Sequence, residues 1–467
     1  MKPKTPQSTI LILCSLLCYT LFGEKYYERH TIHRDASSLS KNSKTYDWPR
    51  YNGPSDDASS TETKLLEKWE KNGPELIWEV TKGEGYASPI ISKDILVLFH
   101  RQNGMEIIEG INPENGRLIW TYKYPVDYKD RYGYSSGPRA SPVIHDNLVF
   151  CHGVTSWLTC LNLMTGELIW KRDLAKEFEI PNYFFGKGSN PIVFKETLIV
   201  NVGGSKNRCV VGFNIKTGKT DWITYDSWGA SYSSPTLSKI NDKHVCLVFT
   251  GGESRPPTGG LIVIDPENGK KLSRYPWRSS KYESANAVPP IPLPGNKVFL
   301  SECYEKGSVV LEFEKDFTPS VVWLNKDINI HWMTPVLKDG TMYGISGRHQ
   351  QGAEAFGLNP LTGQIFWKEA IYWDDFINDR KVKLGLFRGS ILKLNNHFIS
   401  LSELGTLLKL DFSEKGWKIN NKKQLFFAPG TWTLPALSKG LLYIMQNESD
   451  RLSGKKPRLL CFDLRSE

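Results

Sequence analysis

A segment that usually contains proline recurs along this sequence, and most of the residues at a fixed distance before it carry an aromatic ring, a cation or an amide. Nine residues belong to this set. Eight of them lie three residues before the proline or its replacement, and His331 adjoins one of the eight. Arginine binds carboxylates and phosphates through paired hydrogen bonds, and aromatic rings stack on planar groups. If the fold gathers these positions, they bind an anionic or planar ligand or simply pack and hydrogen-bond to water. The candidate ligand-binding residues are Tyr86, Arg139, Tyr232, Asn286, His331, Trp332, Arg388 and Trp432, and Gly188 completes the set.

Other residue types with catalytic or metal-binding chemistry form no recognisable site. Asp374 and Asp375 are adjacent, and adjacent residues of a strand face opposite sides, which argues against joint acid–base work. His30 and His33 supply only two of the three or four ligands that a metal ion needs. The sequence therefore predicts no catalytic residue and no metal site.

The recurring segment marks the elements that must position the nine residues. Ala87-Ser-Pro89, Ala140-Ser-Pro142 and Ser233-Ser-Pro235 are its clearest copies. Proline is tolerated at the first residue of a strand, so each copy indicates a strand start. Looser copies are Ser189-Asn-Pro191, Val288-Pro289, Met333-Thr-Pro335, Gly389-Ser-Ile391 and Thr433-Leu-Pro435, which makes eight strand starts in all.

A second motif follows seven of the eight strand starts. Asn112, Asn162, Asn214 and Asn359 are each followed by Gly four residues later and by Trp eight residues later. Asn caps a turn with its own side chain and Gly accepts positive φ, so the motif predicts a hairpin between two strands. Three degenerate copies begin at Asp265, Glu314 and Asp411 and lead to Trp277, Trp323 and Trp417.

Eight strand starts with seven turns predict eight units, because the chain ends where an eighth turn would fall. The missing fourth strand of the last unit stands near the other end of the chain, at Glu75-Leu-Ile-Trp78-Glu-Val80. Ring closure explains this arrangement, since it hides the sheet edges. We therefore predict an all-β, eight-bladed β-propeller of four-stranded antiparallel blades, closed by an N-terminal strand that completes the last blade.

These units resemble the PQQ-like (quinoprotein alcohol dehydrogenase-like) propeller repeat, and Asp47-Trp-Pro-Arg-Tyr-Asn-Gly-Pro54 is similar to the start of bacterial exported proteins of that kind. The resemblance, which covers residue 47 to the C-terminus, extends to the outer-membrane assembly lipoprotein propeller. It implies that the repeat tryptophans pack between neighbouring blades. Those residues are Trp78, Trp120, Trp170, Trp222, Trp277, Trp323, Trp367 and Trp417.

The resemblance also provides a test for enzyme activity. A quinoprotein dehydrogenase of this kind is expected to carry an adjacent Cys-Cys pair, and a cytochrome tail would carry Cys-x-x-Cys-His; the sequence contains neither. We therefore expect no cofactor, and PQQ with calcium only if the chain is a PQQ-dependent oxidoreductase. The alternatives are that oxidoreductase, with its site at the central funnel, and a carbohydrate-binding module.

The N-terminus indicates export. Lys2 and Lys4 precede an apolar run from Ile10 to Phe22, which is typical of a signal peptide or an N-terminal anchor over residues 1–23. Residues 24–46 are polar and are expected to form a flexible linker, with the propeller at 47–467. The six cysteines after the signal are expected to be mostly small buried thiols, although Cys151 and Cys160 could form a bridge.

The formal net charge of +9 comes from scattered basic residues, so we predict an ordinary solvated surface and no nucleic-acid partner. The sequence favours a non-catalytic exported propeller, monomeric, that acts as a binding scaffold in the periplasm or cell envelope. Its partner would be an envelope protein, a small anionic or planar ligand, or a carbohydrate. Membrane attachment through the N-terminus remains open.

Overall fold

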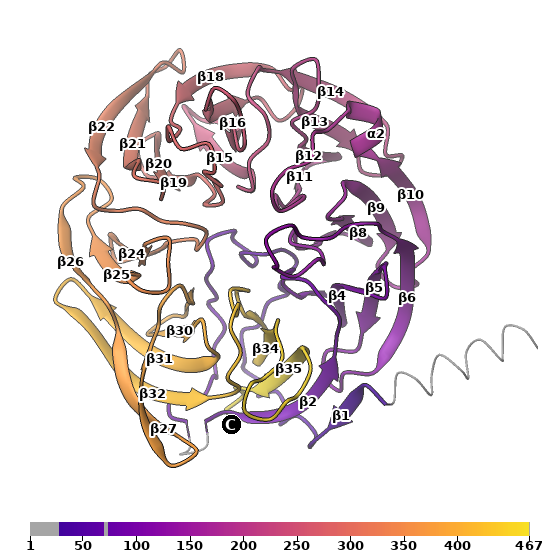
Figure 1. Cartoon of the computed structure of the whole chain (residues 1–467), viewed down its shortest axis with the longest axis vertical. Helices are drawn as coiled ribbons and strands as arrows, with labels where there is room; N and C mark the ends of the chain where they lie inside the picture. The colour runs from indigo at the N-terminus through magenta and orange to yellow at the C-terminus, as the bar shows by residue number, and fades with distance from the viewer. Residues whose placement is uncertain (1–27, 70–72, 467) are drawn as a thin grey trace, which may run out of the picture.

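The computed structural model describes residues 28–69 and 73–466, and nearly all of its regular structure is β-sheet (Figure 1). Eight antiparallel sheets stand as blades around a central axis, which confirms the predicted eight-bladed propeller. The predicted signal segment at 1–23 lies outside the described residues.

The first four blades follow one another along the chain, each with its strands in sequence order from the axis outward. Blade 1 contains β3 (Ile90–Ser92), β4 (Ile95–Gln102), β5 (Met105–Ile111) and β6 (Leu118–Pro125). Blade 2 contains β7 (Val143–His145), β8 (Leu148–His152), β9 (Trp157–Asn162) and β10 (Leu168–Asp173). Blade 3 contains β11 (Ile192–Phe194), β12 (Thr197–Asn201), β13 (Arg208–Asn214) and β14 (Thr220–Tyr225). Blade 4 contains β15 (Thr236–Ile240), β16 (Lys243–Thr250), β17 (Gly260–Ile264) and β18 (Lys271–Pro276).

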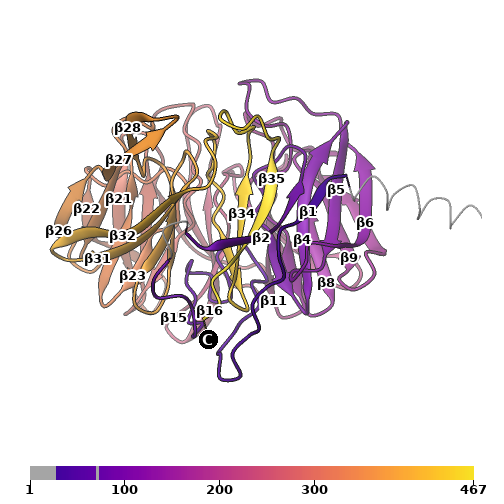
Figure 2. The same cartoon turned by 90° about the horizontal axis from the view of Figure 1, so that it is seen from below.

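The remaining blades complete the ring. Blade 5 contains β19 (Ile291–Leu293), β20 (Lys297–Glu302), β21 (Gly307–Phe313) and β22 (Pro319–Asn325). Blade 6 contains β23 (Val336–Lys338), β24 (Thr341–Ser346), β25 (Glu354–Leu358) and β26 (Ile365–Glu369). Blade 7 contains β29 (Ser390–Lys393), β30 (Phe398–Leu401), β31 (Thr406–Ser413) and β32 (Gly416–Gln424). Blade 8 contains β33 (Ala436–Ser438), β34 (Leu441–Gln446), β35 (Arg458–Asp463), β2 (Glu75–Thr81) and β1 (His30–Ile32). Figure 2 shows the ring from its side, where β34 and β35 run roughly along the axis and the more peripheral β2 and β32 lie across it.

The repeated turn builds the contact between neighbouring blades. In blade 1, the Asn112 side chain accepts a hydrogen bond of 2.9 Å from the Glu114 amide, and Gly116 adopts a φ of +70°. In blade 2, a Cβ atom on the turn residue Gly166 would lie 2.5 Å from the Trp120 ring of blade 1. Glycine is therefore needed there both for its positive φ and for the approach of the neighbouring indole.

Strand register identifies which tryptophans occupy the repeat position. Trp78, Trp120, Trp170, Trp222, Trp323 and Trp367 each follow a bulge opposite the third strand of their blade. In blade 4, Ser273 holds that position opposite Val263, and in blade 7 Asn421 holds it opposite Lys409. Trp277 and Trp417 therefore differ from the other six in register. Trp417 lies elsewhere along β32, and Trp277 lies just beyond β18, where it packs among buried residues of blades 4 and 5.

The two ends of the described chain meet in blade 8, as predicted. Strand β2 pairs antiparallel with β35, with Trp78 opposite Cys461. The Trp78 indole donates a hydrogen bond of 3.0 Å to the Pro113 carbonyl in the turn of blade 1, which joins the last blade to the first. Strand β1 adds a fifth strand at the outer edge, so residues 30–32 of the expected linker belong to a sheet.

A segment from Asp47 to Glu62 crosses one end of the central channel. It pairs with blade 1 through Trp48 and Ile91, and with blade 7 through Ser59 and Lys393. Glu62 ends the crossing at blade 8. In Figure 1 this segment runs through the middle of the ring.

Several smaller features complete the fold. Helix α2 (Leu174–Phe178) follows blade 2, and a hairpin of β27 (Tyr372–Ile377) and β28 (Arg380–Gly385) separates blades 6 and 7. The repeat pattern of the sequence predicts neither element. All six described cysteines are free and buried. Among the described residues, none of the helices has the length and apolarity needed to cross a membrane.

Candidate functional site

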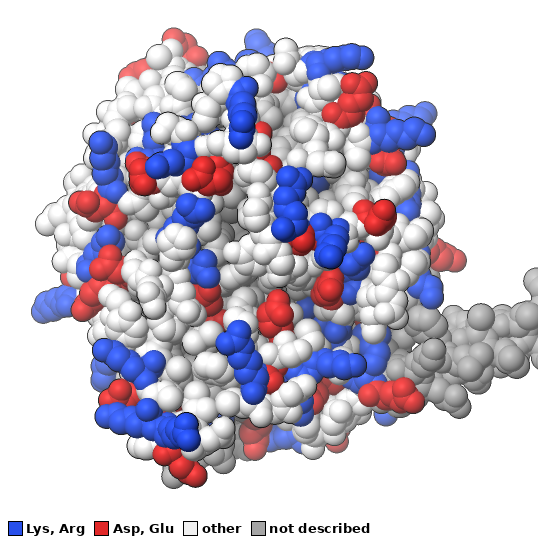
Figure 3. Space-filling view, viewed as in Figure 1, with Lys and Arg blue, Asp and Glu red and all other residues white. Residues whose placement is uncertain are grey.

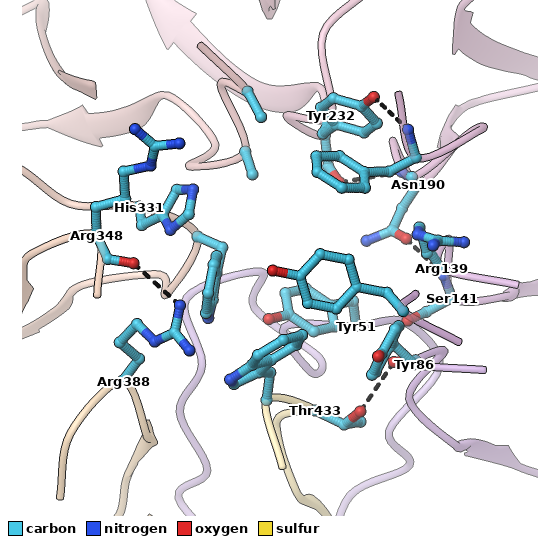
Figure 4. A pocket seen from close by; sticks show the side chains of 18 of the residues that line it. Tyr51, Tyr86, Arg139, Ser141, Asn190, Tyr232, His331, Arg348, Arg388 and Thr433 are labelled. Carbon is cyan, nitrogen blue, oxygen red and sulfur yellow. Dashed lines mark hydrogen bonds between the residues drawn. The ribbon is translucent and has the colours of Figure 1, made fainter. Parts of the chain in front are cut away.

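A cavity of about 310 Å³ opens at the centre of the ring, at the end of the channel opposite the crossing segment (Figure 4). Its walls come from the loops that lead into the innermost strands. Tyr51 of the crossing segment also lines it, and Figure 4 shows its hydroxyl group among the side chains from the surrounding blades. Burial raises the pKa of Tyr51 to about 12, so this hydroxyl is protonated near neutral pH.

Most of the predicted ligand-binding residues meet in this cavity. The lining includes Tyr86, Arg139, Gly188, Tyr232, His331, Trp332, Arg388 and Trp432. Asn286 does not line it, although its neighbours Ala285 and Ala287 do. The Asn286 side chain is buried and accepts a hydrogen bond of 3.0 Å from Ser284, while its carbonyl accepts one from the Tyr232 amide.

Aromatic rings follow one another along the wall of the cavity. The rings of Tyr86 and Trp432 lie 5.3 Å apart between centroids, and those of Trp432 and Trp332 lie 4.9 Å apart. His331 continues the series, 4.1 Å from Trp332. Tyr134 joins it at 5.9 Å from Trp432. Such spacing suits stacking against a planar ligand.

The two predicted arginines already have carboxylate partners. Arg139 forms an ion pair of 2.7 Å with Asp130, whose side chain is fully buried. Arg388 binds Glu403 through its Nη2 and also donates a hydrogen bond of 3.1 Å from its Nε. The Arg388 guanidinium also lies 4.8 Å from the centroid of the Trp332 ring. These arginines therefore hold the walls in place, which lowers their availability to a ligand.

A third arginine, which the sequence analysis missed, also lines the cavity. Arg348 lies in the loop between β24 and β25 and forms no ion pair with any residue that the structure describes. Its guanidinium lies 4.3 Å from the centroid of the Tyr304 ring. Figure 4 shows it on the same side of the cavity as His331 and Arg388. The repeat pattern could not reveal it, because it lies outside the segments that recur.

His331 is held in its neutral form. Burial, followed by the charges of Arg388 and Arg348, lowers the pKa of His331 to about 3. Its Nε2 lies 3.4 Å from the Tyr304 hydroxyl oxygen. A neutral imidazole offers one donor and one acceptor, so His331 adds polarity to the cavity without adding charge.

The charge of the lining has one sign. Arg139, Arg348 and Arg388 line the cavity, and within the described chain no aspartate or glutamate does. The nearby Glu253 lies behind the wall, where it accepts hydrogen bonds from the Tyr232 hydroxyl and the Phe184 amide. The residues between 28 and 466 that the structure describes bring together no three His, Cys, Asp or Glu side chains as a metal site.

Comparisons with known proteins agree with the propeller. BamB from Moraxella catarrhalis aligns with a TM-score of 0.54 at 12% identity, over 84% of this chain and 98% of that one. Quinohemoprotein alcohol dehydrogenase from Comamonas testosteroni aligns with a TM-score of 0.59 at 13% identity, over 90% of this chain and 81% of that one. At these identities the likeness concerns the fold alone.

A curated relative matches a shorter region. Tetrathionate hydrolase from Acidithiobacillus ferrooxidans is 24% identical over 180 residues, which make up 35% of this chain and 32% of the hydrolase. The chain thus matches about a third of that enzyme's length. The family described as outer membrane protein assembly factor BamB matches residues 104–369, more than half of the sequence. On that match, the chain belongs to this family of PQQ-like β-propellers.

Proposed function

We propose that this chain is a non-catalytic, exported binding propeller of the cell envelope, and that its central cavity binds a small anionic ligand with a planar ring. The observation that carries the proposal is the lining: three arginines and a run of aromatic rings, with no carboxylate from the described residues. Figure 3 shows the face that carries the opening, hollowed near its centre, with both basic and acidic side chains on the surface around the hollow.

Arg348 is the residue that we expect to contact the anion. Arg139 and Arg388 are neutralised by Asp130 and Glu403, whereas Arg348 has no such partner in the described chain. Arginine pairs with carboxylates and phosphates in a two-point contact, and the nearby Trp332 and Trp432 rings can stack on the planar part. The ligand would therefore place its acidic group beside blade 6.

The proposal is tested by titrating the purified protein with PQQ, a planar tricarboxylate, while following tryptophan fluorescence without calcium. Saturable quenching supports the cavity site if the affinity for PQQ is about tenfold or more lower in Arg348→Met. A tenfold loss of affinity corresponds to about 1.4 kcal/mol of binding free energy. Arg451 is exposed in the loop after β34, so Arg451→Met is the matched control and should bind PQQ like the unmodified protein. Equal quenching in both variants would exclude Arg348 from the site.

A PQQ-dependent oxidoreductase is the second candidate, favoured by the same cationic and aromatic lining. The donors fit the acidic, planar part of PQQ, but the described residues of the lining supply no carboxylate for a calcium ion. We therefore derive no redox step. Repeating the titration with calcium and an electron-accepting dye separates the two functions: sustained dye reduction with an alcohol would replace the binding role by an enzymatic one.

A further inference from the structure

Strand β22 is an unusually apolar outer edge. It exposes Val321, Val322 and Leu324, with 48%, 39% and 51% of their surface accessible. Its sequence, Pro319-Ser-Val-Val-Trp-Leu-Asn325, contains no charged residue. Figure 1 places β22 at the periphery of the ring, far from the central cavity.

The fourth strand of every other blade carries charge. Edge strands present unpaired backbone groups, and proteins commonly protect them with charged side chains, especially lysine. One charged residue from the fourth strand of each of the other seven blades illustrates this: Glu79 in β2, Lys123 in β6, Lys171 in β10, Asp221 in β14, Lys271 in β18, Lys368 in β26 and Lys422 in β32. Blade 5 alone has no charged residue on its fourth strand, and in blade 8 the added strand β1 covers the outer edge of β2.

Blade 8 shows what an added strand does at such an edge. Strand β1 pairs antiparallel with β2, with Ile32 opposite Trp78. The carbonyl of Ile77 accepts a hydrogen bond of 2.7 Å from the His33 amide, and Ile77 is completely buried. The residues that precede the repeat tryptophan in blades 1 and 2, Ile119 and Ile169, are 44% and 43% exposed. Val322 holds the same position in blade 5.

We propose that the outer edge of β22 binds an extended, uncharged, apolar strand of a partner polypeptide, as β2 binds β1. Main-chain hydrogen bonds would supply affinity, and Val322 and Leu324 would select apolar side chains. The uncharged edge offers no complement to an acidic or basic segment. This surface is distinct from the cavity, so the proposal does not depend on the ligand proposed there.

The size of the edge argues for a flexible segment rather than a second propeller. A seven-residue strand extends about 23 Å, whereas stable interfaces between folded proteins bury about 1,200–2,000 Å². A rigid second copy would need further contacts beside the strand. An extended segment can lie along the edge and form main-chain hydrogen bonds with it, without further contacts beside the strand.

The test uses the full mature chain and a fluorescent peptide with the sequence of residues 319–325, which can pair antiparallel with β22. Saturable binding at or below about 1 mM, with slower hydrogen exchange confined to the β22 amides, is the expected result. The variant Val322→Lys, Leu324→Lys should bind about tenfold or more weakly. Ile119→Lys, at the matching position of β6, should bind normally.

Several outcomes would overturn the proposal. These are absence of binding, unchanged affinity in the β22 variant, or exchange protection on another blade. The hydrogen-exchange measurement uses the unmodified protein, so it locates the peptide-binding edge even if the double variant folds poorly. A dimer in sedimentation equilibrium that the β22 variant abolishes would assign the edge to a second copy instead of a partner strand.

Discussion

Arg139 and Arg388 stand at the same repeat position in blades 2 and 7, and each neutralises a buried carboxylate. Arg348 stands outside the repeat and has no carboxylate partner in the described chain. At the scale of single residues, the role of an arginine therefore depends on its neighbours rather than on its type. The first two stabilise the cavity wall, and the third is available to a ligand.

Removing Arg388 should destabilise the fold. Arg388→Met leaves Glu403, whose side chain is only 3% exposed, without its cation, and stranding a buried charge costs about 3–5 kcal/mol. Adding Glu403→Gln removes that charge and should recover part of the loss. Urea denaturation followed by fluorescence measures both. A single variant as stable as the unmodified protein would show that the pair contributes nothing.

His152 should make the protein sensitive to acid. Burial, and then the charge of Lys187, lowers the pKa of His152 to about 3, against about 6.5 in an unfolded chain. Between these pH values the unfolded chain binds a proton that the folded chain does not. The free energy of unfolding therefore decreases by about 1.4 kcal/mol for each unit by which the pH is lowered.

His152→Leu should remove that contribution while keeping the site apolar. The free energy of unfolding, measured in urea from about pH 6 to about pH 4, should decline less steeply than in the unmodified protein. An unchanged slope would mean that His152 is protonated in the folded state as well.

At the scale of elements, five of the eight blades are each held to the next by a tryptophan that packs on a turn glycine. Trp120 of blade 1 contacts Gly166 of blade 2, and its indole donates a hydrogen bond of 2.8 Å to the Leu163 carbonyl of the same turn. The turn thus serves both its own hairpin and the neighbouring blade. Blades 4 and 7, with Ser273 and Asn421 at the repeat position, are joined by other contacts.

The contact predicts a difference between two glycines of similar backbone conformation. Gly166 has a φ of +71° and a Cβ would collide with Trp120, whereas Gly104 has a φ of +74° and open space around it. Gly104→Ala should cost only the backbone strain, about 1–2 kcal/mol. Gly166→Ala should cost about 1–3 kcal/mol more because the indole must move.

Urea midpoints of the two variants measure this difference. Equal losses would show that the indole shifts without cost and that the blade contact is loosely packed.

At the scale of the whole molecule, the segment before β2 ties distant blades together. Glu62 is buried and accepts hydrogen bonds of 2.8 Å from the amides of Tyr46, Lys439 and Gly440. It therefore anchors the crossing segment to blade 8. The same segment carries Tyr51 to the cavity, so ring closure and the cavity floor depend on one stretch of chain.

Glu62→Gln should weaken this anchor by about 2 kcal/mol, because hydrogen bonds to a charged group contribute about 1.5–3 kcal/mol. Glu67→Gln, at an exposed position just after the crossing segment, is the matched control. Thermal unfolding and limited proteolysis near residue 62 measure the effect. Identical behaviour of the two variants would contradict the anchoring role.

The sequence by itself determined the strand pattern of a blade and the number of blades. The Asn-x-x-x-Gly turn of Asn112 to Gly116 and the proline before each inner strand act within a few residues, so their pattern is readable without the fold. Seven of the eight inner strands directly follow a proline, from Pro89 before β3 to Pro435 before β33. Counting these units also predicted that Trp78 belongs to the last blade.

Only the tertiary structure decided the chemistry of the cavity. Loops that share no motif determine which carboxylate neutralises Arg139 and which neutralises Arg388. They also bring Arg348 to the same cavity. The cavity floor at Tyr51 arises from a segment far in sequence from blades 6 and 7. Local patterns determine strands because backbone geometry repeats, whereas charge balance and closure depend on contacts between residues that the chain separates widely.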